Sequence, residues 1–115
     1  METLQIAARR IDDVTILDLE GRLVLGQATE VLGNALQEAM GRGARKILLN
    51  MKMVTQVDTT GISTIVRAFV SLQRSGGKLG LFQISERVRQ ILDLTRLLNV
   101  IPSYADEGDG LARIR

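Results

Sequence analysis

Residues 46–50, KILLN, followed by residues 57–62, VDTTGI, give the strongest structural signal in this chain. The first segment is a nearly continuous apolar run, which is typical of a central strand covered on both faces, although so short a run is also compatible with a buried helical turn. The second places Asp and Thr, both preferred N-cap residues, just before an apolar stripe that begins at Ile62. We therefore predict a buried strand over 46–51, a short loop, and a helix from about Thr60 to Ser75.

Outward from this stretch, hydrophobic periodicity predicts further strands and helices. Strands are expected at 4–8, 14–19, 78–84 and 100–104, with a polar turn at 10–13, a loop at 21–28, and Pro102 favouring an edge position for the last strand. A helix is expected to carry Val31, Leu32, Ala35, Leu36 and Ala39 and to end at Gly41 and Gly43, and another to cover 86–98. The acidic segment from Asp106 is expected to be a solvated tail, with a possible helical turn at 111–115.

The expected order is β-β-α-β-α-β-α-β. Three strand–helix–strand units in succession predict right-handed crossovers and an α/β fold with a mostly parallel or mixed sheet of four to five strands and three to four helices. The chain has 115 residues and shows neither a linker nor a convincing repeat, so a single domain over 1–115 is expected.

Composition excludes several classes of function. The chain has no Cys and no His, which removes disulfides, thiol nucleophiles, the usual zinc sites and Ser-His-Asp chemistry; we expect no metal, no cofactor and no enzymatic activity. Aromatic residues make up 3% and the net charge is +2, which disfavours nucleic-acid binding. No apolar run approaches the ~18 residues of a membrane span. With no signal-peptide pattern after Met1-Glu2-Thr3, we expect a cytoplasmic protein without membrane insertion.

The candidate site is Asp58-Thr59-Thr60-Gly61 at the predicted helix start. One interpretation is structural: any of Asp58, Thr59 and Thr60 could be the N-cap. The other is functional, because a helix start is a favourable place for a phosphate, whether bound or attached to a threonine. Gly61 costs about 1 kcal/mol relative to alanine inside a helix, which suggests the close approach of a partner or ligand.

Other polar clusters have simpler interpretations. Residues 75–78, SGGK, end a helix and open a strand, which is the reverse of a phosphate loop. On the third predicted helix, the basic residues Arg87, Arg89 and Arg96 are interpreted as a solvated face. Near the C-terminus, the acidic residues Asp106, Glu107 and Asp109 lack the pattern of a calcium-binding loop. In the first turn, the pair Asp12 and Asp13 lacks an acid–base partner.

The stretch 44–61 resembles the signature of STAS domains, the fold of bacterial anti-sigma factor antagonists. Further ordered similarities are Gly21-Arg22-Leu23, residues 76–79 (GGKL) and residues 88–95 (VRQILDLT), so that the resemblance covers almost the whole chain. It implies a STAS fold of the SpoIIAA type. The chain departs from the family's usual pattern in having threonines where serines are common and Val24 where an aspartate is frequent.

The resemblance also implies a function. In such antagonists the hydroxyl residue before the motif glycine is phosphorylated by the partner, an anti-sigma factor that is a serine/threonine kinase of the histidine-kinase-like ATPase type. That role maps to Thr60, with Thr59 as second choice. The residues then expected to bind the partner are Asp58, Thr59, Thr60, Gly61 and Ile62. Through this binding the protein is expected to regulate sigma-factor-dependent transcription. Two alternatives stay open: a STAS subunit of a lipid-transport or stress-sensing complex without phosphorylation, and a small nucleotide-binding module.

Overall fold

The computed structural model describes residues 4–115 as an α/β fold; Met1, Glu2 and Thr3, on which the localisation expectation drew, lie outside the described residues. The elements follow one another in the expected order, with a short 3-10 helix added and with a full last helix in place of the expected single turn. They are β1 (Gln5–Ile11), β2 (Val14–Leu23), α1 (Gln27–Gly41), β3 (Lys46–Val57), α2 (Thr59–Arg74), β4 (Lys78–Phe82), α3 (Glu86–Leu94), η1 (Leu97–Asn99), β5 (Ser103–Tyr104) and α4 (Glu107–Arg113).

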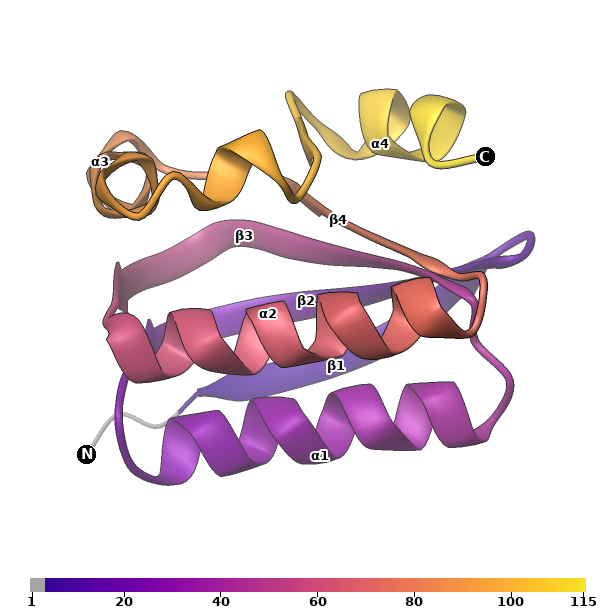
Figure 1. Cartoon of the computed structure of the whole chain (residues 1–115), viewed down its shortest axis with the longest axis horizontal. Coiled ribbons are helices and arrows are strands. Elements are labelled where there is room, and N and C mark those ends of the chain that lie inside the picture. The colour runs from indigo at the N-terminus through magenta and orange to yellow at the C-terminus, as the bar shows by residue number, and fades with distance from the viewer. Residues whose placement is uncertain (1–3) are drawn as a thin grey trace.

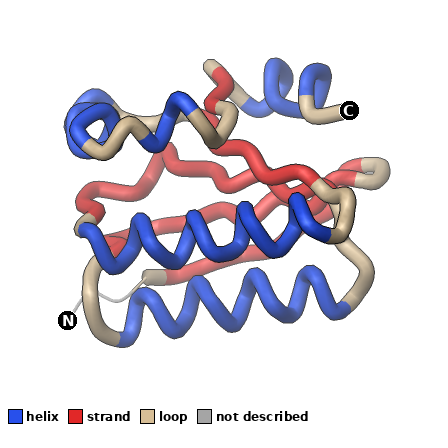
Figure 2. The backbone as a smooth tube through the Cα atoms, in the orientation of Figure 1, coloured by secondary structure: helices blue, strands red, loops and turns tan. Residues whose placement is uncertain are grey.

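One five-stranded sheet organises the molecule, in the order β1-β2-β3-β4-β5. β2, β3, β4 and β5 run parallel, and β1 pairs antiparallel with β2, which confirms the predicted mixed sheet. α1 and α2 lie side by side over one face (Figure 1). α3, η1 and α4 lie on the opposite side of the strands (Figure 2). The strand containing Tyr104 is at an edge, as the nearby proline predicted.

The sheet is covered by buried apolar residues on both faces. Leu17 and Leu19 belong to the large cluster, which includes buried residues of α1, α2 and α3, whereas Val14 and Ile16 belong to a smaller cluster beside α4. This confirms the alternation expected for the second strand. The segment from Glu107 is a helix and Ile114 is buried in the smaller cluster, so the expectation of a solvated tail is wrong there, although a helical turn near the C-terminus was expected. Asp106 caps α4, and α4 covers the second face.

Two strands are longer than the sequence predicts, and both extensions lead toward the candidate site. β2 continues to Leu23 instead of ending at residue 19, so the predicted loop at 21–28 shortens to residues 24–26. β3 continues to Val57, where a loop was expected after Met51. The two extensions pair with each other through register shifts near Asp18 and Gly21. These shifts break the period of two, so the buried residues of β3 recur at Met51, Val54 and Val57 and hide the strand pattern.

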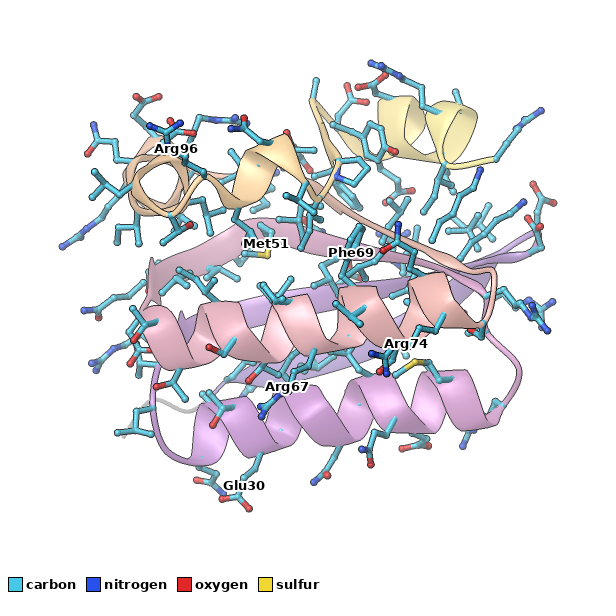
Figure 3. The ribbon with its side chains drawn as sticks, viewed as in Figure 1. Glu30, Met51, Arg67, Phe69, Arg74 and Arg96 are labelled. Atoms are coloured by element: carbon cyan, nitrogen blue, oxygen red, sulfur yellow. The ribbon has the colours of Figure 1, made fainter. Side chains whose placement is uncertain are left out.

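The third predicted helix is divided in two. α3 ends at Leu94, Arg96 adopts a left-handed backbone conformation with φ +57°, and η1 follows. Val88 and Leu92 are fully buried in the cluster that also contains Met51. Figure 3 shows Met51 between β3 and the segment after α3, and Arg96 on the outer side of that segment. The first turn is likewise tighter than expected: it occupies Asp12 and Asp13, because β1 extends to Ile11.

An ion-pair cluster holds α4 against β1 and β2. Arg9 donates hydrogen bonds to Asp18, at 2.6 and 3.0 Å, and another to Glu107. The hydrogen bond from Arg9 lowers the pKa of Asp18; partial desolvation opposes this shift and a hydrogen bond from Asn50 adds to it. The hydrogen bonds to Asp18 and Glu107 in turn raise the pKa of Arg9. The cluster therefore connects the first strands to the last helix.

This cluster predicts a loss of stability at acid pH. An unfolded Asp has a pKa of about 3.9, and the folded Asp18 binds its proton less readily. The contribution of Asp18 is therefore complete above that pH and is lost as the pH falls through its lowered folded pKa. Urea unfolding from pH 6 to pH 2.5 should show a steeper acid loss for wild type than for Asp18→Asn. Identical slopes would contradict this assignment.

Candidate functional site

The candidate site is built where β3 ends and α2 begins. Asp58 is the N-cap residue of α2, and its side chain bridges two segments. Its Oδ1 accepts a hydrogen bond from the Gly61 N–H at 2.9 Å, and its Oδ2 accepts one from the Leu25 N–H at 2.8 Å. Of the three capping candidates in the sequence, the structure therefore selects Asp58, and the two threonines are not needed as caps.

The two threonines form the first turn of α2. The helix begins at Thr59, one residue earlier than predicted. Thr59 is exposed and Thr60 is half-buried. Their carbonyl oxygens accept hydrogen bonds from the hydroxyls of Ser63 and Thr64, at 2.9 and 3.1 Å. Among residues 4–115, no hydrogen bond engages the Thr59 or Thr60 hydroxyl itself. Both hydroxyls are thus free of a structural hydrogen bond.

Gly61 is required by the chain's own packing. It is buried, and a Cβ atom added there would lie 2.4 Å from the Leu23 carbonyl oxygen and 2.7 Å from Leu23 Cγ. The sequence suggested the close approach of a partner or ligand at Gly61; the structure shows that the segment close to Gly61 is the end of β2. Ile62 is only 7% exposed and belongs to the large core cluster. Of the five residues predicted to contact a partner, Asp58, Thr59 and Thr60 are the ones with accessible surface.

The electrostatics of the helix start are set by Asp58. Partial desolvation is the largest single influence and opposes ionisation, but the backbone N–H groups of Leu25, Gly61 and Thr60 together lower the pKa of Asp58. The carboxylate therefore stays charged at neutral pH and neutralises the positive end of the α2 dipole. The position that a bound phosphate would take at this helix start is already filled by Asp58.

Sequence reasoning missed one residue of this site. Leu25 lies in the three-residue loop between β2 and α1, with 74% of its surface exposed, and its backbone is fixed to Asp58. The neighbouring Val24, noted for its departure from the family pattern, is half-buried. The available signal for Leu25 in the sequence was that an apolar residue stands inside a predicted loop. That Leu25 lies close to Asp58 could not be predicted, because it depends on the extension of β2 to Leu23. We name the surface of Leu25, Asp58, Thr59 and Thr60 the α2 start surface.

The SGGK segment and most of the basic residues of the third predicted helix lie where the simpler interpretations place them, while Arg89 is half-buried. Ser75 is the C-cap of α2, and Gly76 (φ +82°) and Gly77 lead into β4, so the SGGK segment does not open a helix. Arg87 and Arg96 are exposed. Within residues 4–115, no three acidic residues converge as metal ligands would. No helix in the same range has the length and apolar character to cross a membrane.

Comparison with known proteins gives the family. The profile of the STAS domain matches residues 5–110. An anti-sigma F factor antagonist of Paenibacillus polymyxa is 24% identical over 112 residues, which cover 96% of this chain and 95% of the relative. A crystal structure from Thermotoga maritima, of a protein provisionally named an anti-sigma factor antagonist, superposes with a TM-score of 0.89 at 25% identity, covering 96% and 94% of the two chains.

A further neighbour shares the fold at lower identity. The phosphorylated form of the Bacillus cell fate determinant SpoIIAA superposes with a TM-score of 0.74 at 19% identity, covering 96% of this chain and all of that one. This likeness confirms the expected SpoIIAA-type architecture. With a family match over most of its length, the chain belongs to the STAS domain family.

Proposed function

We propose that this protein is an anti-sigma factor antagonist that is switched off by phosphorylation of Thr60, with Thr59 as the second-choice residue. Its partner is an anti-sigma factor that is also a serine/threonine kinase of the histidine-kinase-like ATPase type. The protein itself acts by binding and not by catalysis, and it controls sigma-factor-dependent transcription. The observation that carries the proposal is the near full-length similarity to a named antagonist, joined to two free hydroxyls at the α2 start surface.

The α2 start surface suits a reversible partner contact. Leu25 supplies an exposed apolar side chain that a partner can bury. Thr59 and Thr60 lie next to it on a helix start whose backbone is already capped, so the partner does not have to complete the fold of this segment. A kinase can therefore reach a hydroxyl there without unwinding α2.

The geometry also suggests how the phosphate would act. A phosphate adds a charge of about −1.5 to −2 at pH 7. Because the Asp58 carboxylate already accepts the Gly61 N–H, the phosphate is repelled from the helix backbone and is presented toward the partner. The switch is then an electrostatic change on the contact surface and not a change of fold, since burying the new charge without a counter-ion costs binding energy.

Phosphorylation by the partner kinase tests the proposal. Wild-type protein incubated with the kinase and ATP should gain one phosphate per chain by mass spectrometry, and Thr60→Ala should gain none while still binding the kinase. Thr59→Ala is the matched control and should be phosphorylated like wild type. Undiminished phosphorylation of Thr60→Ala would reject Thr60, and loss in Thr59→Ala alone would transfer the role to Thr59.

A further inference from the structure

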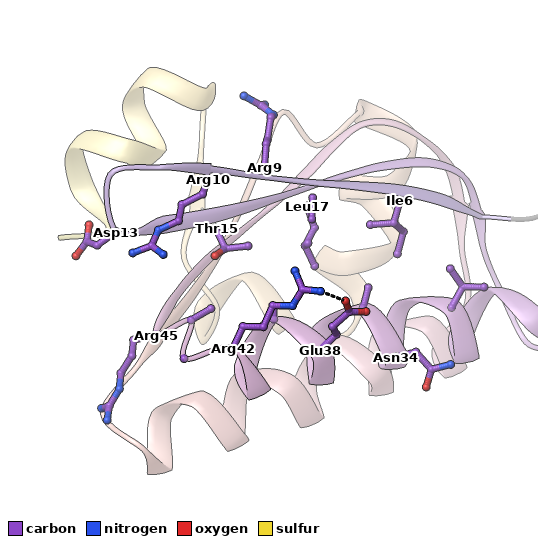
Figure 4. A pocket seen from close by; sticks show the side chains of 16 residues that line it. Ile6, Arg9, Arg10, Asp13, Thr15, Leu17, Asn34, Glu38, Arg42 and Arg45 are labelled. Atoms are coloured by element: carbon purple, nitrogen blue, oxygen red, sulfur yellow. Dashed lines mark hydrogen bonds and ion pairs between the residues drawn. The ribbon is translucent and has the colours of Figure 1, made fainter.

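A pocket of about 800 Å³ lies between α1 and the β1–β2 part of the sheet, as Figure 4 shows. Its volume falls within the range of ~300–1,000 Å³ that is common for small-molecule sites. The lining does not include Asp58, Thr59 or Thr60. The pocket is therefore separate from the α2 start surface.

One part of the pocket is an apolar trough. Ile6 forms its wall on the sheet, and Val31 and Ala35 form its wall on α1. Leu17 lies behind this wall with no exposed surface. Ala8 extends the sheet wall and is itself exposed. Alanines on both walls leave open a volume that larger side chains would fill.

The other part of the pocket is positively charged. Figure 4 shows Arg10, Arg42 and Arg45 at one end, where the chain leaves α1, while Ile6 and Asn34 lie at the opposite end. Arg42 is paired with Glu38 at 2.8 Å, and Asp13 is paired with Lys46 at 2.8 Å. Among the described residues, Arg10 and Arg45 form no salt bridge, and their hydrogen bonds go to the carbonyl oxygens of Asp12 and Ser75. Asp13 lies close enough to Arg10 to interact with its charge, so the positive charge of Arg10 is only partly offset.

We propose that this pocket binds a fatty acid, with the acyl chain in the trough and the carboxylate at the Arg10 end. Apolar lining along one part and the guanidinium of Arg10, which forms no salt bridge among the described residues, at one end match the two halves of such a ligand, and Arg binds carboxylates with two parallel hydrogen bonds. The carboxylates of Glu38 and Asp13 at the same end favour a ligand with a single negative charge over a phosphate ester with two. This inference is independent of the proposed partner switch.

Binding of laurate below its micelle concentration tests the inference by calorimetric titration on the full chain. We expect saturable one-to-one binding, and we expect Arg10→Gln to weaken it about tenfold through loss of a charge-assisted hydrogen bond. Arg87→Gln, an exposed change on α3, is the matched control and should bind like wild type. Dodecanol and dodecyl phosphate should both bind more weakly than laurate.

A second pair of variants tests the trough. Ala8→Phe fills the pocket from β1 and should abolish binding, whereas Ala7→Phe places the same side chain on the opposite face of that strand, outside the pocket lining, and should not. If Ala8→Phe does not fold, amide shifts of the wild type on laurate addition give the location, and changes confined to β1, β2 and α1 are expected. Absence of saturable binding, equal affinity for dodecanol, tighter binding of dodecyl phosphate, or shifts centred on the start of α2 would each overturn the proposal.

Discussion

Gly61→Ala should destabilise the protein by about 2–3 kcal/mol, as expected for overpacking in a well-packed interior. The new methyl group would lie 2.4 Å from the Leu23 carbonyl oxygen, which accepts the Asp58 N–H at 3.2 Å. Relief requires α2 or β2 to move, and either movement disturbs the junction between them. Thermal unfolding should show a midpoint lower by roughly 10 °C.

Gly33→Ala provides the matched control for this change. Gly33 lies inside α1, and a Cβ atom added there meets nothing within 4 Å. The same substitution should therefore stabilise the protein by up to about 1 kcal/mol through helix propensity. If both variants shift stability in the same direction, the clash with Leu23 is not what requires glycine at position 61.

Thr60→Glu should weaken binding to the anti-sigma partner by at least about tenfold, which corresponds to about 1.4 kcal/mol. The added carboxylate lies on the α2 start surface beside Asp58, and a partner would have to desolvate it without an evolved counter-ion. The helix dipole favours a negative charge here by about 0.3–1 kcal/mol, but the charge of Asp58 opposes it. We therefore expect little change in the free energy of unfolding.

Thr60→Gln is the control for size without charge and should retain most of the affinity. Calorimetric titration against the partner and thermal melts of the three proteins measure both quantities. Equal affinity of Thr60→Glu and wild type would place Thr60 outside the interface. A large loss for Thr60→Gln would show that shape, and not charge, is what the partner detects.

Sequence periodicity predicted the element order and the central strand correctly for a local reason. The KILLN run is apolar on both faces because β3 lies between two other strands with apolar clusters on each side. The start of α2 was predicted within one residue because Asp58, Thr59 and Thr60 are capping types directly before an apolar stripe. Such signals depend on neighbours within one turn of the chain, and no distant contact contradicts them.

The candidate site could be located from sequence, but its internal roles could not. Two threonines and one aspartate were equivalent as caps until Asp58 was found to bridge Gly61 and Leu25. The Leu25 bond links residues 33 positions apart, and it depends on the extension of β2. The same extension explains why glycine is required at position 61: a larger residue there would collide with Leu23, and no ligand is needed to account for the glycine.

By itself the sequence determined the order of strands and helices, the position of the helix start and the pair of threonines there, because each follows from local residue types and their spacing. The STAS fold was implied by the resemblance of the chain to that family. Only the tertiary structure decided that β2 and β3 extend to the site, that α4 covers the second face, and that a pocket remains beside α1. Each of these depends on pairing or packing between segments far apart in the chain. The register shifts between β2 and β3 are the clearest case, because they conceal the alternation by which a strand is recognised.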